Sequence, residues 1–226
     1  MPRLARLLAV LLLAGTALLG LGAAIHPMLP GDATEQLEMI AATPLWRTIH
    51  LAMLTGTALI IAGVWVRLVT DRTQSAVMTI APLAMISIGL AIDALNIAFM
   101  AGAGWQMADL FASGRRDVVP IFEMTHPIGL VAARFGNLIV ALGALTLGWV
   151  EWRDPSRPRW LAWLAWAAAA GGFVGVIFFN EASRLALAAI ALLSGWQIAT
   201  AIRALTDRAV TDRAVTDRAL TDRAAS

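Results

Sequence analysis

Hydrophobic residues along the chain gather in six long runs that short polar segments separate. The runs cover residues 4–25, 45–69, 77–103, 120–150, 160–179 and 185–205. A helix of about 20 apolar residues crosses the roughly 30 Å hydrocarbon core of a bilayer. The pattern therefore predicts an all-α, polytopic membrane bundle with six transmembrane helices.

The first run also fits a secretory signal peptide. Arg3 and Arg6 precede a Leu-rich segment that ends in the small residues Gly22, Ala23 and Ala24. Such a segment is typical of a cleaved leader. Cleavage after Ala24 would leave five transmembrane helices, whereas the length of the apolar run favours an uncleaved anchor.

The composition supports a membrane protein whose main partner is the lipid bilayer. Of the 226 residues, 59% are hydrophobic and 14% are charged, which is too apolar for an ordinary soluble domain. Cysteine is absent, so disulfides and thiolate chemistry are excluded. The net charge is only +2 and the basic residues lie mainly at run ends and in the tail, so no nucleic acid partner is expected.

The basic residues also predict how the chain is oriented. Most arginines lie on one side of the predicted helices, with Arg115 and Arg116 of an outer loop as a mild exception, and positive residues favour the cytoplasmic side of membrane proteins. We therefore expect a bacterial-type inner-membrane protein with both termini in the cytoplasm. The arginines that carry this prediction are Arg3, Arg6, Arg67, Arg72, Arg153, Arg157, Arg159 and Arg203.

The chain divides into one transmembrane domain, residues 1–205, and a low-complexity tail, residues 206–226. The tail repeats the motif Thr-Asp-Arg-Ala-Val/Leu. A five-residue step turns an apolar residue by about 140° around a helix, so no apolar stripe builds up. We expect a solvated cytoplasmic tail.

A polar stripe crosses the fourth run. Glu123, His126, Arg134 and Asn137 fall within an arc of about 80° when each residue turns a helix by about 100°. Ionisable groups at membrane depth are costly and usually mark a functional site. On the adjacent face, Gly129, Gly136 and Gly143 recur every seven residues and predict close packing of a neighbouring helix.

The predicted topology gathers further polar residues at the outer side, while the inner halves of the helices are expected to be almost wholly apolar. Asp93 should lie at the depth of Arg134, which predicts an ion pair between the third and fourth helices. His26 follows the first run beside Pro27, where a solvated or capping role is expected. The supporting polar residues are His26, Asn96, Asn137 and Glu181.

The histidines suggest cofactor chemistry. His50 and His126 lie well inside predicted helices and could be the two axial ligands of haem b. Glu123 precedes His126 by three residues, so His50, His126 and Glu123 could instead hold copper or zinc. The leading prediction is a site for a metal, haem b or a small ligand, in a protein that could join partner subunits of a redox complex.

Two alternatives use the same residues without a cofactor. A carboxylate beside an imidazole could serve an acid–base enzyme that acts on a lipid or isoprenoid. An outward-facing polar vestibule could instead serve the transport of a small solute or of protons. No hydrolase elbow, zinc-protease motif, phosphate loop or dinucleotide fingerprint occurs in the sequence, so the catalytic residues stay unassigned.

Overall fold

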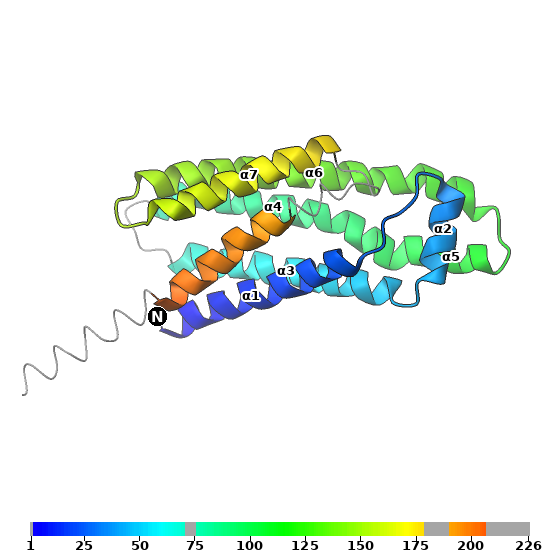
Figure 1. The fold of residues 1–226 in the computed structure, drawn as a ribbon, viewed down its shortest axis with the longest axis horizontal. Helices are drawn as coiled ribbons and strands as arrows, with labels where there is room; N and C mark the ends of the chain where they lie inside the picture. Colours follow the sequence, from blue (N-terminus) through cyan, green and yellow to red (C-terminus); the bar gives the residue numbers. More distant parts are fainter. Residues whose placement is uncertain (1, 71–75, 179–189, 207–226) are drawn as a thin grey trace, which may run out of the picture.

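The computed structural model describes residues 2–70, 76–178 and 190–206, which form an elongated bundle of helices with no β-strand among them (Figure 1). In chain order the elements are α1 (Pro2–Ile25), α2 (Ala33–Ala42), α3 (Trp46–Thr70), α4 (Ala76–Phe99), the π-helical turn η1 (Met100–Gly104), α5 (Trp105–Ala112), α6 (Val118–Arg153) and α7 (Arg159–Phe178). A further apolar helix covers Ile190–Thr206.

The predicted membrane bundle is confirmed. Within the described residues, five helical segments are long and apolar enough to cross a membrane: Arg3–Ile25, Trp46–Thr70, Val77–Ala112, Val118–Arg153 and Arg159–Ile177. They correspond to the first five predicted spans. The predicted sixth span, 185–205, begins outside the described residues, and the rest of it lies in the shorter helix Ile190–Thr206. Glu181 and residues 207–226 of the tail also lie outside the described residues.

Two of the five segments are much longer than a membrane requires. Val77–Ala112 and Val118–Arg153 each contain 36 residues, or about 54 Å of helix against about 30 Å of hydrocarbon. They project at the end where Figure 1 shows α2 and α5, which we call the histidine end. The turn between α6 and α7, residues 154–158, lies at the opposite end, which we call the arginine end.

A second apolar core forms at the histidine end. There α2, η1, α5 and the start of α6 pack together around buried apolar side chains: Leu29, Leu37, Ile40, Trp46, Met100, Met107, Ala108, Phe111, Val118 and Phe122. The larger core runs along the bundle. The polar residues at the histidine end are thus supported by a packed cap that projects from the bundle.

The helix α2 adds to the six predicted helices and lies in the polar segment between the first two runs. Asp32 caps this helix, since its Oδ1 accepts hydrogen bonds from the backbone N–H groups of Thr34 and Glu35. The spacing of Asp32 and Glu35, followed by the buried Leu37 and Ile40, is a helix-start signal in the sequence.

Glycines set the closest approach between two pairs of helices. A Cβ atom on Gly15 of α1 would lie 2.7 Å from the carbonyl oxygen of Gly56 in α3, and one on Gly136 of α6 would lie 2.5 Å from that of Gly89 in α4. Only residues without a side chain allow backbones to come this near. The packing face predicted for Gly136 and its seven-residue neighbours on α6 is confirmed, and α4 is the helix that covers it.

Candidate functional site

Two histidines from different helices meet at the histidine end. His26 directly follows α1, and His50 lies one turn into α3, where 3% of it is exposed. The His26 Nε2 atom is 3.2 Å from the His50 Nε2 atom, which is hydrogen-bond distance. His26 therefore does not have the isolated solvated or capping role expected of it, but forms a pair with a buried histidine.

The surroundings of His50 fix which nitrogen carries its proton. Its Nδ1 atom lies 2.8 Å from the backbone carbonyl oxygen of Trp46, and a carbonyl can only accept a hydrogen bond. Nδ1 of His50 must therefore be the donor. In the neutral ring this leaves His50 Nε2 as an acceptor, so His26 donates to it through Nε2–H. The result is a directed chain of hydrogen bonds from His26 through His50 to the start of α3.

Trp46 holds the histidine pair in place. Its ring centroid lies 4.9 Å from that of His26 and 4.5 Å from that of His50. The indole is fully buried, and its Nε1–H donates to the Met100 carbonyl oxygen over 3.1 Å. Met100 begins the π-helical turn η1. A π-helical turn often occurs at a functional site. Here the turn accepts the hydrogen bond of the Trp46 indole, which contacts both imidazole rings.

The four residues of the predicted polar stripe on α6 lie in different environments. His126 is 4% exposed, and its ring stacks on Phe122 at a centroid distance of 4.7 Å, with Phe99 at 6.1 Å. Glu123 and Arg134 are exposed, whereas Asn137 is half-buried. Residues three apart still differ by about 60° around a helix, so Glu123 points outward although His126 points inward.

The structure does not support the predicted metal site of His50, His126 and Glu123. Among the residues it describes, no group of three or more His, Asp or Glu side chains lies close enough to hold a metal ion. The physical reason is that Glu123 is exposed and His126 is stacked among phenylalanines. The Nε2 atom that His50 would offer to haem iron faces His26 instead.

Asp93 and Asn96 of α4 face α6 deeper in the bundle. Asn137 Nδ2 donates both to Asp93 Oδ1, over 3.2 Å, and to the Ala133 carbonyl oxygen, over 2.9 Å. The buried Oδ1 of Asn96 lies against Gly129, with no hydrogen-bond partner in the described part of the chain. Asn137 is thus the partner that the structure shows for Asp93, and the ion pair with Arg134 stays a prediction.

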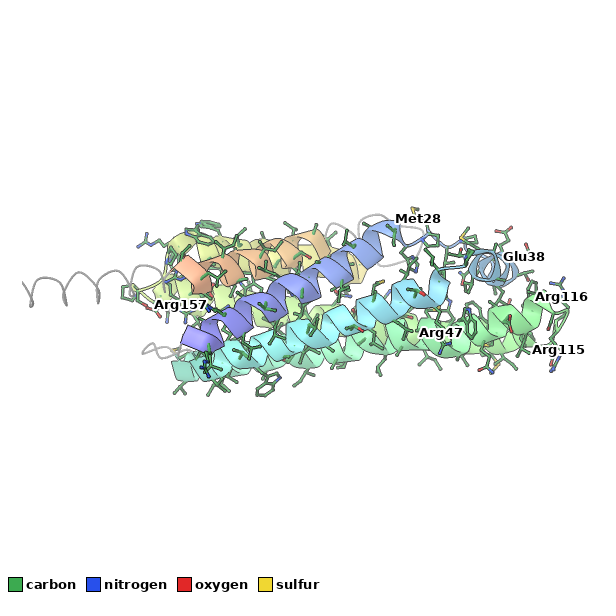
Figure 2. The ribbon with its side chains drawn as sticks, turned by 90° about the horizontal axis from the view of Figure 1, so that it is seen from below. Met28, Glu38, Arg47, Arg115, Arg116 and Arg157 are labelled. Atoms are coloured by element: carbon green, nitrogen blue, oxygen red, sulfur yellow. The ribbon has the colours of Figure 1, made fainter. Side chains whose placement is uncertain are left out.

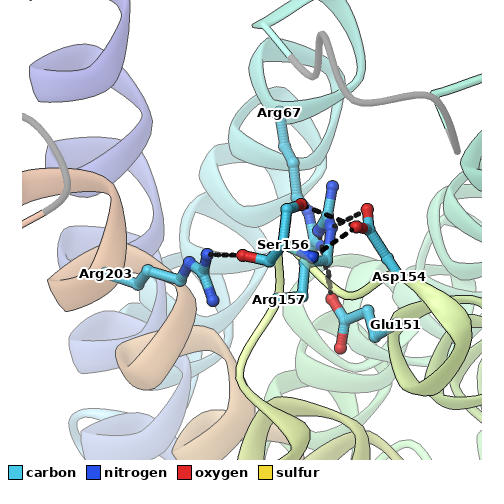
Figure 3. A network of polar contacts seen from close by, with 6 residues as sticks. All are labelled: Arg67, Glu151, Asp154, Ser156, Arg157 and Arg203. Atoms are coloured by element: carbon cyan, nitrogen blue, oxygen red, sulfur yellow. Dashed lines mark hydrogen bonds and ion pairs between the residues drawn. The ribbon is translucent and has the colours of Figure 1, made fainter.

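A buried ionic network at the arginine end was missed by the sequence analysis (Figure 3). Glu151 is fully buried on α6, and its Oε1 accepts a hydrogen bond from Arg67 Nη2 of α3. Arg157 Nη1 lies 3.5 Å from the same oxygen, and Arg157 Nε donates to Asp154 Oδ2. Arg203 of the helix Ile190–Thr206 donates to the carbonyl oxygen of Ser156. The network joins three helices to the α6–α7 turn.

This network corrects the expectation that the inner halves of the helices are almost wholly apolar. In the sequence, Glu151 directly follows the fourth run, and Arg67 is one of the arginines that predict the orientation. Both side chains are buried, and Arg67 Cζ lies 5.4 Å from the Trp196 ring centroid. Further along the bundle, Thr16 donates to Gln197 Oε1 in a buried contact between α1 and the helix Ile190–Thr206. The clue in the sequence was a glutamate directly after an apolar run.

Several atoms in and near the network lack hydrogen-bond partners within the described residues. They include Arg67 Nη1, Glu151 Oε2 and Trp196 Nε1, all in buried side chains. Atoms of this kind in a packed interior are usually bonded to ordered water. At the histidine end, by contrast, the hydrogen bonds of Trp46 and His50 are made within the protein.

Neither end can be assigned by similarity, since no protein-family model, no curated protein and no solved structure matches the chain.

Proposed function

We propose that the chain is a multi-pass inner-membrane protein that takes up and releases a proton at the His26–His50 pair. The observation that carries the proposal is the Nε2-to-Nε2 contact of 3.2 Å between the two rings, with Nδ1 of His50 anchored on Trp46. Histidine is the side chain whose charge ordinarily changes between pH 5 and 8. A pair joined in this way holds one proton more easily than two, because two imidazolium rings in contact repel each other.

The placement of the two rings suits exchange with the aqueous phase. His26 is half-buried, whereas His50 is almost completely buried. A proton that arrives at His26 strengthens the Nε2–H hydrogen bond to His50, because hydrogen bonds from a charged donor are stronger than neutral ones. His26 follows α1 and His50 belongs to α3. Proton uptake would therefore tighten the contact between these two helices.

The proposed orientation places the histidine end outside and both termini in the cytoplasm. Arg153, Arg157, Arg159 and Arg203 all belong to the arginine end or contact it. An excess of arginine near helix ends favours the cytoplasmic side. The His26–His50 pair would then sample the pH outside the membrane.

The test uses the purified full chain with histidine-selective isotope labelling. Because the sequence holds three histidines, each ring can be followed by NMR as the pH is changed. We expect His26 and His50 to titrate as a coupled pair that gains its first proton well before its second. Nitrogen shifts should also show His50 protonated at Nδ1 in the neutral pair.

Two variants make the test specific. His50→Gln should leave His26 to titrate as a single, uncoupled imidazole. His126→Gln is the matched control, because this buried histidine stacks on Phe122 and is not part of the pair. Independent titration of all three rings in the parent protein would refute the proposal.

A second candidate function, transfer of the proton further inward, is favoured by Asp93. Its carboxylate lies at the α4–α6 contact, hydrogen-bonded to Asn137. Asn96 Oδ1, which has no hydrogen-bond partner among the described residues, belongs to the same helix nearer the histidine end. Liposomes with a trapped pH indicator would show proton entry that Asp93→Asn abolishes. Equal rates for the parent, this variant and empty liposomes would count against transfer.

A further inference from the structure

The α6–α7 hairpin carries a tryptophan cluster at the arginine end. The Trp152 ring contacts Trp163 and Trp166 at centroid distances of 5.9 Å and 5.6 Å, and these two lie 5.2 Å apart. Trp163 is 60% exposed, and Trp149, one turn before Trp152, is 50% exposed. Tryptophan is enriched where a membrane protein meets the headgroups of the lipids. The cluster therefore presents an aromatic surface of the kind that lies among lipid headgroups.

Two exposed arginines lie on this surface. Arg153 Cζ is 4.5 Å from the ring centroid of Trp149, and Arg159 Cζ is 4.7 Å from that of Trp152. Trp149 and Trp152 are three residues apart, about 60° around α6, so the two guanidinium groups are held over adjacent indoles of the same hairpin. Stacking on an indole orients a guanidinium without using its N–H donors.

The acidic residues of the hairpin do not neutralise these two arginines. Glu151 is buried and contacts Arg67 and Arg157, and Asp154 binds Arg157 and Ser156. Within the described residues, neither Arg153 nor Arg159 has a carboxylate partner. The hairpin thus presents two positive charges outward, next to exposed indole rings.

We propose that Arg153 and Arg159 bind the phosphate of an anionic phospholipid. Guanidinium groups bind phosphate oxygens through two parallel N–H donors. Basic positions beside membrane helices on the cytoplasmic side attract anionic lipids. The exposed faces of Trp149 and Trp163 would contact the glycerol and upper acyl chains of the same lipid. A zwitterionic lipid offers the same phosphate but carries a cation that these arginines repel.

The experiment titrates the full-length protein in detergent with phosphatidylglycerol or with phosphatidylcholine of identical acyl chains. Native mass spectrometry then counts the bound lipids. The double variant Arg153→Gln/Arg159→Gln should bind phosphatidylglycerol about 30-fold more weakly, which is the effect of removing two arginines from an anionic surface. Its weak binding of phosphatidylcholine should not change.

The control is Arg115→Gln/Arg116→Gln, which removes the same charge from exposed positions at the histidine end, at the opposite end of the bundle from Arg157 (Figure 2). Arg116 also lies over an aromatic ring, that of Phe111, so the control removes one stacked arginine together with the ion-paired Arg115. This variant should keep the phosphatidylglycerol affinity of the parent. Equal losses in both double variants, or equal affinity of the parent for both lipids, would overturn the proposal.

Discussion

An arginine and a carboxylate form an ion pair at each end of the molecule, in opposite surroundings. At the arginine end, Arg67 and Glu151 pair in the interior, with exposed side-chain fractions of 8% and 0%. At the histidine end, Arg115 and Asp117 pair in the α5–α6 turn, and both side chains are 60% exposed. Both pairs join a guanidinium to a carboxylate, so their difference in burial decides how much each pair affects the free energy of unfolding.

The two ends of the molecule are also assembled in different ways. The arginine end connects α3, α6 and the α6–α7 turn through charged groups that left water on folding. The histidine end relies on an apolar core and on neutral hydrogen bonds from Trp46 and His50, with its ion pair outside. A buried pair destabilises strongly when one partner is lost, whereas an exposed pair contributes little.

The largest effect is expected from breaking the buried pair. Glu151→Gln keeps the size of the side chain but leaves Arg67 in the interior without its carboxylate. The free energy of unfolding in mixed micelles, measured by denaturant titration, should fall by about 3–5 kcal/mol. The double variant Arg67→Met/Glu151→Leu should recover most of this loss, because no unpaired charge remains. A loss below about 1 kcal/mol in the single variant would show that Arg67 reaches water.

A smaller effect is expected at the α4–α6 contact, which lies between the two ends. In Gly136→Ala, the new Cβ would lie 2.5 Å from the Gly89 carbonyl oxygen and 2.6 Å from the Asp93 backbone nitrogen. Backbone atoms cannot turn away, so the helices must separate, at a cost of about 1–3 kcal/mol. The same denaturant titration measures the change.

The control for this variant is Gly20→Ala in α1, where an added Cβ would meet no atom within 4 Å. It should leave stability unchanged or raise it slightly, because alanine is the better helix former. If Gly136→Ala were as harmless as Gly20→Ala, the contact between α4 and α6 would be looser than the structure shows.

The spans could be predicted from the sequence because membrane depth demands long apolar runs, and that demand is local. The ends of the helices were harder to predict from the sequence. The third run was expected to stop at residue 103, but the helical path continues through η1 and α5 to Ala112, past the glycines Gly102 and Gly104. Packing of Met107 and Phe111 in the second core favours this continuation.

The site residues were harder to predict because their meaning depends on contacts between helices. His26 meets His50 only because α1 packs against α3, where Gly15 faces Gly56. A single sequence does not state which glycines face each other. Likewise, the sequence shows Glu151 only as a residue at the end of an apolar run. Its role becomes clear from the fold, in which Arg67 of α3 lies beside it. The sequence suggested His50 and His126 as partners, whereas the structure brings His50 beside His26.

The smallest effect is expected from Arg115→Gln, the exposed counterpart of the buried pair. Arg115 hydrogen-bonds the Asp117 carboxylate and lowers the pKa of that group. A lowered pKa in the folded state stabilises the fold above the ordinary pKa of aspartate, and this contribution disappears as the pH falls through the lowered value. Water and salt screen the pair, so the unfolding midpoint at neutral pH should not move measurably. NMR should instead show the pKa of Asp117 rising towards its ordinary value.

The two readouts of this variant separate contact from stability. The carboxylate titration reports whether Arg115 touches Asp117, and the unfolding midpoint reports whether the contact matters for the fold. We expect the titration of Asp117 to change and the unfolding midpoint to stay constant. Glu151→Gln, in contrast, is expected to lose much of its stability. A large loss of stability in Arg115→Gln would mean that another part of the protein covers the α5–α6 turn, because an ion pair open to water cannot supply it.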